Sequence, residues 1–79
     1  MKDDGKSLAE CVADDITSMI IVEKRFLPGN KLLNENDFSK ELFVSRSTFR
    51  EAVKILSERG ILEVKHGSGT YVAKNIASN

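Results

Sequence analysis

One segment, residues 44–53 with the sequence VSRSTFREAV, constrains the fold more than any other part of the chain. Ser45 is a favourable helix N-cap, because its hydroxyl can accept a hydrogen bond from an otherwise unpaired backbone N–H. Val44 and Phe49 stand on either side of that cap at the spacing of a hydrophobic staple. We therefore predict a helix over residues 46–59. Its apolar face, at i, i+3, i+4 and i+7, consists of Phe49, Ala52, Val53 and Leu56.

Another side of the same predicted helix is cationic. Arg46, Arg50 and Lys54 recur every four residues, with the hydroxyls of Ser47 and Thr48 beside them. A helix with one face in a core and cations on another suits recognition of base edges in the major groove of DNA. A solvated surface helix, with Arg50 paired to a nearby acid, explains this segment equally well. The sequence of the neighbouring segments is needed to distinguish the two interpretations.

Two further helices are predicted before this one. Ser7 and Glu10 have the spacing of a capping box. The helix that they begin should end near Lys24 or Arg25, where cations suit the negative end of the helix dipole. Its core face is predicted to contain Leu8, Val12, Ile16 and Ile20.

Asn34 is a good cap for the second helix, over residues 35–42. Leu33 and Phe38 again have staple spacing, and Phe38 and Leu42 are core candidates. Phe43 and Val44 form a tight connection into the third helix.

The C-terminal part of the sequence predicts a β-hairpin. Gly60 stands where a left-handed residue would stop the third helix. Residues 61–64 and 70–73 have strand character, and a glycine-bearing loop at 65–69 lies between them. A very short strand is also predicted at 31–33. The expected fold is α+β and mainly helical, a winged helix-turn-helix of three helices plus a two-stranded hairpin wing over residues 8–73. Residues 1–7 are expected to be a disordered tail and residues 74–79 a linker.

Bulk properties narrow the setting. The chain has 79 residues, enough for one domain, and its single cysteine, Cys11, excludes an internal disulfide. No segment is long and apolar enough to span a bilayer, so a cytoplasmic protein with no membrane partner is expected. The formal net charge is zero, but residues 1–42 hold six Lys/Arg and nine Asp/Glu, whereas residues 43–79 hold six and three. The positive half contains the predicted recognition helix.

With these elements in order, the sequence resembles the DNA-binding domain of the GntR family of bacterial transcription regulators, in its FadR-like branch. The resemblance covers roughly residues 8–73. The motifs that carry it are FLPGNKL at 26–32, NE at 34–35, VSRSTFREA at 44–52, Leu56 with GIL at 60–62, and HGSGTYV at 66–72.

The resemblance implies a transcription regulator, most often a repressor, whose recognition helix enters the major groove and whose wing approaches the minor groove. Arg46 and Arg50 match the arginines that contact DNA in the family, and His66 and Gly67 match the wing tip. Polar and charged residues close to these positions complete the set of candidates. The candidate DNA-binding residues are Glu35, Asn36, Ser45, Arg46, Ser47, Thr48, Arg50, Lys54, Lys65, His66 and Gly67. The implied partners of the full-length protein are a near-palindromic operator, a second copy of the chain in a homodimer, and a small-molecule effector bound by a C-terminal domain. No cofactor is expected.

The sequence departs from the family pattern in four places, of which Leu33 in place of the family's proline is expected to matter little. The family usually has arginine where this chain has Asn36, so one cationic DNA contact is weakened or missing. The turn before the third helix commonly carries glycine, where Phe43 either alters the turn or adds an aromatic ring to the core edge. Family members also carry an effector domain, so this chain is either an excised DNA-binding domain, which we expect, or a stand-alone protein.

The sequence bears on two other classes of function. A winged helix can serve as a protein-interaction module, and the surplus apolar residues Ile21 and Val22 are the feature that favours this alternative. An enzyme is not expected, because the only histidine lies in a glycine-rich loop and no metal-ligand set or phosphate-binding motif is present in the sequence.

Overall fold

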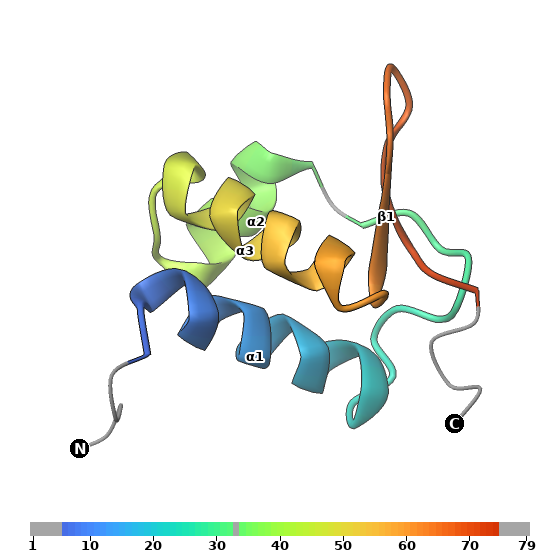
Figure 1. Cartoon of the computed structure of the whole chain (residues 1–79), viewed down its shortest axis with the longest axis horizontal. Coiled ribbons are helices and arrows are strands. Elements are labelled where there is room, and N and C mark those ends of the chain that lie inside the picture. The colour runs from blue at the N-terminus through green and yellow to red at the C-terminus, as the bar shows by residue number, and fades with distance from the viewer. Residues whose placement is uncertain (1–5, 33, 75–79) are drawn as a thin grey trace.

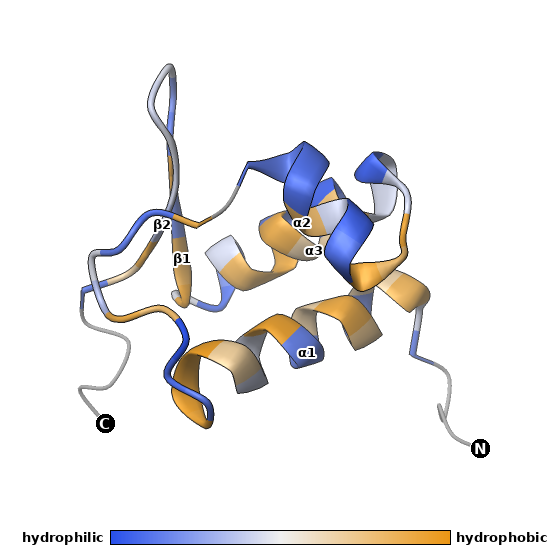
Figure 2. Ribbon diagram, turned by 180° about the vertical axis from the view of Figure 1, so that it is seen from behind, coloured by the Kyte–Doolittle hydropathy of each residue, from blue (hydrophilic) through white to orange (hydrophobic). Residues whose placement is uncertain are grey.

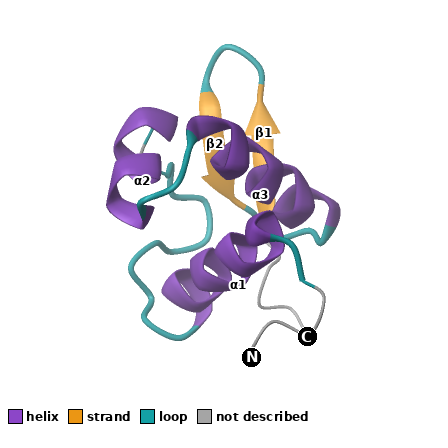
Figure 3. Ribbon diagram, turned by 90° about the vertical axis from the view of Figure 1, so that its left-hand side faces the viewer, coloured by secondary structure: helices purple, strands orange, loops and turns teal. Residues whose placement is uncertain are grey.

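Three helices and a β-hairpin follow one another in the predicted order. The computed structural model describes residues 6–32 and 34–74. Its elements are α1 (Leu8–Ile21), α2 (Glu35–Leu42), α3 (Arg46–Glu58), β1 (Leu62–Lys65) and β2 (Gly69–Val72). The strands β1 and β2 form a two-stranded antiparallel sheet. The hairpin loop stands on the far side of the molecule from α1 (Figures 1 and 3). The predicted winged helix-turn-helix is confirmed.

The core lies where α1 crosses α3 and where α2 and the base of the hairpin close the sides (Figure 2). Phe38 from α2 stacks on Phe49 from α3 with ring centroids 5.4 Å apart, which fixes the two helices against each other. As predicted, α3 buries its apolar face. The buried core residues are Val12, Ala13, Ile16, Ile20, Leu32, Phe38, Phe49, Ala52, Val53, Leu56, Leu62 and Val72.

Every helix begins at the residue that the sequence predicted. Ser7 and Glu10 form the full capping box at the start of α1. The Asn34 side chain accepts a hydrogen bond from the backbone N–H of Asp37, and Ser45 accepts one from Thr48. These local bonds satisfy backbone donors that would otherwise be unpaired at helix starts.

The predicted end and core face of α1 are partly wrong. The helix stops at Ile21, because Lys24 adopts the left-handed conformation (φ 56°) and the N–H of Glu23 bonds back to the carbonyl of Ser18. Leu8 is 60% exposed, and its place in the core is taken by Ala9. The buried side of α1 therefore includes Ala9 and Ala13 together with Val12, Ile16 and Ile20, and it is turned slightly from the predicted side.

Phe43 forms the turn between α2 and α3. Its backbone is left-handed (φ 60°, ψ 42°), as a glycine would be at this position, and its N–H bonds to the carbonyl of Lys40. The side chain is 93% exposed. The alternative that this ring adds to the core edge is wrong, because the left-handed backbone directs it into solvent.

The hairpin is shifted by about one residue from its predicted bounds. Because β1 extends to Lys65 and β2 starts at Gly69, the loop consists of residues 66–68 rather than 65–69. Gly67 has a φ of 78°, and the N–H of Ser68 bonds to the carbonyl of Lys65. The helix α3 ends at Glu58, with Arg59 as its cap and Gly60 in the predicted left-handed conformation.

The strand predicted at 31–33 is reduced to a single bridge between Lys31 and Tyr71. It nevertheless joins the segment before α2 to the hairpin, since Leu32 N–H bonds to the carbonyl of Thr70. Leu33 and its predicted staple, the first five residues of the tail 1–7, and residues 75–79 of the linker lie outside the described residues. Among the described helices, none has the length and apolar character needed to cross a membrane.

Candidate nucleic-acid interface

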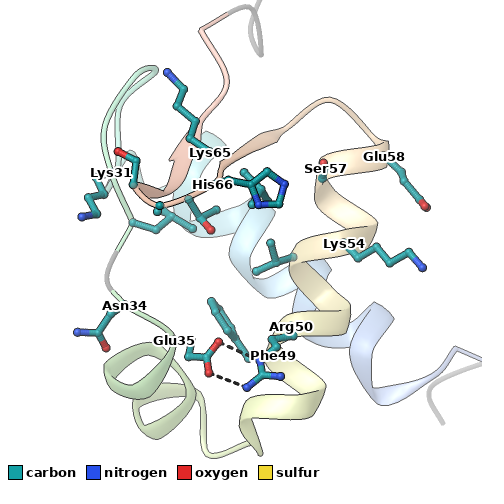
Figure 4. Close-up of a pocket in the computed structure, with 17 residues that line it drawn as sticks. Lys31, Asn34, Glu35, Phe49, Arg50, Lys54, Ser57, Glu58, Lys65 and His66 are labelled. Carbon is teal, nitrogen blue, oxygen red and sulfur yellow. Dashed lines mark hydrogen bonds and ion pairs between the residues drawn. The ribbon is translucent and has the colours of Figure 1, made fainter.

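A groove runs between the exposed side of α3 and the hairpin, and the start of α2 closes one end of it (Figure 4). The residues that line it come from four segments of the chain. They are Lys31, Leu32, Asn34, Glu35, Phe49, Arg50, Val53, Lys54, Ser57, Glu58, Val64, Lys65, His66, Gly67, Ser68, Gly69 and Thr70. The core residues Phe49 and Val53 also line the groove and make part of its surface apolar, whereas most of the other lining residues are polar or charged.

The charge of the groove favours an anionic ligand. Its lining includes four Lys/Arg side chains, Lys31, Arg50, Lys54 and Lys65, against two glutamates, Glu35 and Glu58. All four cations are exposed. Local clusters of Lys and Arg bind phosphates regardless of the charge of the whole chain. A net charge of zero is therefore compatible with a nucleic-acid site here.

The start of α3 presents a small set of hydroxyls. The Ser45 hydroxyl accepts from the backbone N–H of Thr48 and donates to Thr48 Oγ1, both at 3.0 Å. Its single proton is thus used inside the cap, while the Thr48 hydroxyl keeps its own proton for another acceptor. Ser45, Arg46 and Ser47 are exposed. A helix N-terminus with hydroxyls and arginine beside it suits phosphate oxygens and base edges.

Arg50 is held by Glu35 across the two helices. Its Nε donates to Glu35 Oε1 and its Nη2 to Oε2, each at 3.0 Å (Figure 4). These hydrogen bonds lower the pKa of Glu35 below its usual value and raise the pKa of Arg50, and the charge of Arg46 also lowers the pKa of Glu35. The acid that pairs with Arg50 is therefore Glu35, 15 residues away, rather than a neighbour in α3.

The wing presents the cationic side chain of Lys65 beside an exposed loop. Lys65 Nζ lies 5.0 Å from the centre of the Tyr71 ring, and the Tyr71 hydroxyl is 2.9 Å from that of Ser68. His66 and Gly67 are exposed in the loop, as predicted for a wing tip.

Lys31 is a groove residue that sequence reasoning missed. Its side chain runs closely over Gly69, where a Cβ atom would come within 2.7 Å of Lys31 Cε. Gly69 also has a φ of 137°, so both its conformation and this approach favour glycine. No local pattern marked Lys31, because its place in the groove depends on long-range backbone pairing with the hairpin. This pairing includes the bridge to Tyr71 and the bond from Leu32 N–H to the carbonyl of Thr70.

The structure thus gathers six of the eleven candidates in the groove: Glu35, Arg50, Lys54, Lys65, His66 and Gly67. The others are not part of its lining and stand at the helix starts. Asn36 is exposed in the first turn of α2, and Ser45, Arg46, Ser47 and Thr48 begin α3. Among the described residues no group of His, Cys, Asp and Glu could hold a metal ion.

Three helices with a hairpin standing beside the third define a winged helix-turn-helix domain. The pattern of the bacterial regulatory proteins of the gntR family matches residues 8–72. The chain belongs to this family.

Solved structures and curated relatives agree with that assignment. The chain is similar to the Streptococcus agalactiae GntR structure, with 45% identity and a TM-score of 0.81 over 87% of this chain and 32% of that one. It is similar to AraR(DBD) in complex with operator ORR3, with 31% identity and a TM-score of 0.74 over 92% of both chains.

Among curated relatives, the Uxu operon transcriptional regulator of Escherichia coli (strain K12) is 36% identical over 59 residues, which are 75% of this chain and 23% of the relative. The chain spans between 23% and 29% of the length of the first curated relatives that it matches.

Proposed function

We propose that this domain binds double-stranded DNA sequence-specifically, as the DNA-binding part of a transcription regulator. The observation that carries the proposal is the pair of cationic surfaces on either side of one groove. One is the exposed side of α3 with Arg50 and Lys54, and the other is the wing with Lys65. A structural relative of similar fold, AraR(DBD), is described in complex with an operator.

In this proposal α3 enters the major groove of DNA. An arginine end fork can donate two parallel hydrogen bonds to O6 and N7 of guanine, so Arg46 and Arg50 read bases. Ser47 and Thr48, at the positive end of the helix dipole, bind phosphate oxygens. The Ser45 hydroxyl serves chiefly as a cap, since its proton goes to Thr48.

The wing follows the DNA backbone toward the minor groove. Lys65 and Lys31 approach phosphates, and Lys54 does so from α3. His66 and Gly67 stand at the tip, where the absence of a side chain on glycine lets the backbone come close to the DNA. Asn36 supplies a neutral group where the family usually has arginine, so the first turn of α2 contributes little electrostatic attraction.

The full-length protein is proposed to be a homodimer on a near-palindromic operator, since paired half-sites match the two-fold symmetry of a dimer. Effector binding by a further domain, a cytoplasmic location and repression rather than activation stay predictions from the family resemblance. Enzymatic activity is not proposed.

The test is selection of duplexes from a random pool, followed by titration of the enriched duplex against salt. We expect a half-site or palindromic consensus and an affinity that falls as salt rises. Arg46→Ala should lower the affinity for that duplex by about tenfold or more and relax preference at one base position. Glu51→Ala, on an exposed part of α3, is the matched control. Failure of both the domain and a forced dimer to enrich any duplex would contradict the proposal.

A protein-contact surface is the second candidate, because Ile21 and Val22 at the end of α1 are 50% and 73% exposed. Packing within the described residues therefore does not bury these two side chains. The double change Ile21→Ser and Val22→Ser should leave duplex binding unchanged and reduce binding only to a protein partner. A loss of duplex binding in this variant would count against separate surfaces.

A further inference from the structure

The geometry of the Glu35–Arg50 pair leaves one particular part of the guanidinium available. The carboxylate occupies the side edge of Arg50, which consists of Nε and one hydrogen of Nη2. The end fork, formed by Nη1 and the second hydrogen of Nη2, is not used by this contact. That end fork can donate two parallel hydrogen bonds to O6 and N7 of guanine.

The glutamate is the more firmly placed member of the pair. The Glu35 side chain is 34% exposed, against 67% for Arg50. Glu35 is the first residue of α2, directly after the Asn34 cap, and α2 is fixed on α3 by the stacking of Phe38 on Phe49. The carboxylate therefore offers a rigid anchor, whereas the arginine reaches outward from α3.

We propose that Glu35 is a positioning residue that sets the specificity of Arg50, holding its side edge so that the end fork faces DNA already oriented. This inference rests on the proposed DNA-binding function and deepens it. Both Glu35 oxygens accept from Arg50, so in this proposal Glu35 acts through Arg50 and does not itself read a base. Orientation before binding reduces the side-chain entropy that is lost when the contact forms.

The pairing also has an electrostatic consequence. The charge of Arg50 is compensated by Glu35, so the pair adds little to attraction toward phosphate in general. The Glu35–Arg50 pair instead contributes to the preference of the domain for one base over another. A glutamate that only competed with DNA for Arg50 would have the opposite effect, since its removal would strengthen binding to every sequence.

The experiment compares Glu35→Gln with Glu51→Gln, which removes the same charge from an exposed position of α3. Binding is measured to the duplex that the wild type selects and to a duplex of mixed sequence. Both variants should bind the mixed duplex slightly more tightly. Only Glu35→Gln should lose affinity for the selected duplex, by about fivefold to tenfold, with relaxed preference at one guanine.

The same change in an Arg50→Ala background isolates the mechanism. If Glu35 acts through Arg50, Glu35→Gln should there change affinity no more than Glu51→Gln does. An equal loss in both backgrounds would overturn the proposal, because Glu35 would then act on DNA directly. Tighter binding of Glu35→Gln to the selected duplex, with unchanged base preference, would also overturn it and identify Glu35 as a competitor.

Two further readouts keep the test decisive. Thermal unfolding of each variant separates a folding defect from a binding defect. Arg50→Lys, an exposed change on α3, keeps the charge but cannot form a fork, so it should lose base preference in the same way. If neither the wild-type domain nor its forced dimer selects a duplex, the proposed function fails, and this failure is seen before any variant is compared.

Discussion

The two sides of α3 differ in burial, in charge and in the reach of their contacts. One side packs Phe49, Ala52, Val53 and Leu56 against the rest of the core, and each is less than 10% exposed. The other leaves Arg46, Arg50 and Lys54 in solvent beside a groove. Because buried apolar contacts govern stability and exposed cations do not, stability and binding should respond to different substitutions in the same helix.

The largest expected effect comes from the buried side. Leu56→Ala should lower the free energy of unfolding by about 2–5 kcal/mol, because Leu56 is fully buried and a cavity would remain. Chemical denaturation measures the loss, with Glu51→Ala as an exposed control on the same helix. Under conditions where the variant is folded, its affinity for the selected duplex should equal that of the wild type. A large affinity loss in the folded variant would break the separation of the two sides.

A gain of binding should be available next to the groove. Asn36→Arg restores the cation usual in the family at an exposed position of α2. It should strengthen duplex binding by about threefold to tenfold and steepen the dependence of log affinity on log salt by about 0.9. Stability should stay within about 0.5 kcal/mol. Asn36→Gln is the neutral control, and an equal gain from it would show that charge is not the cause.

The turn between the two helices offers a smaller, purely conformational effect. Phe43→Gly should raise the free energy of unfolding by about 0.5–1 kcal/mol. The change removes the steric strain of a non-glycine residue in the left-handed conformation, and this gain exceeds the entropy cost of a more flexible unfolded chain. The ring is 93% exposed, so little burial is lost. Phe43→Ala keeps the left-handed strain and should give no such gain. Equal stabilisation by both variants would assign the effect to the ring instead of the backbone.

The smallest effect concerns an ion pair at the other end of α3. Asp14 on α1 pairs with Lys6 and with Arg59, and these contacts lower the pKa of Asp14 below its usual 3.8. A lowered folded-state pKa contributes stability above the unfolded pKa, and this contribution is lost as pH falls through the folded value. Asp14→Asn should therefore lower the Tm by a few degrees at most near neutral pH. The difference from wild type should vanish in strong acid.

Exposed Asp15, the next residue along α1, is the control for that measurement. Asp15→Asn should leave the Tm nearly unchanged at every pH. If Asp14→Asn and Asp15→Asn behaved alike, the pairing at the end of α3 would contribute nothing beyond net charge, as many surface ion pairs do. Together with the Glu35 variants, this result would show whether two similar ion pairs at opposite ends of α3 serve different purposes.

Local signals explain why so much of the fold was predictable. The caps Ser7, Asn34 and Ser45 bond within three residues along the chain, so their types and spacing suffice to place the helix starts. The apolar face of α3 and the stop at Gly60 are likewise periodic or single-residue signals. The end of α1 was less predictable, because a left-handed Lys24 has no strong sequence marker.

The groove was predictable only in part. The cations of α3 and the wing tip are visible in the sequence, but Lys31 enters the groove through a bridge to Tyr71, which lies far along the chain. The outward direction of Phe43 depends on the backbone conformation of the turn rather than on hydropathy.

The sequence by itself determined the order of the elements, the helix starts, and which side of α3 is apolar, because those properties depend on neighbours within one or two turns. Only the tertiary structure decided that the Glu35 carboxylate accepts two hydrogen bonds from the side edge of Arg50, each at 3.0 Å. That contact requires α2 and α3 to cross at a fixed angle, which the packing of Phe38 on Phe49 sets. An interaction between residues 15 apart depends on how helices pack, and no local pattern encodes it.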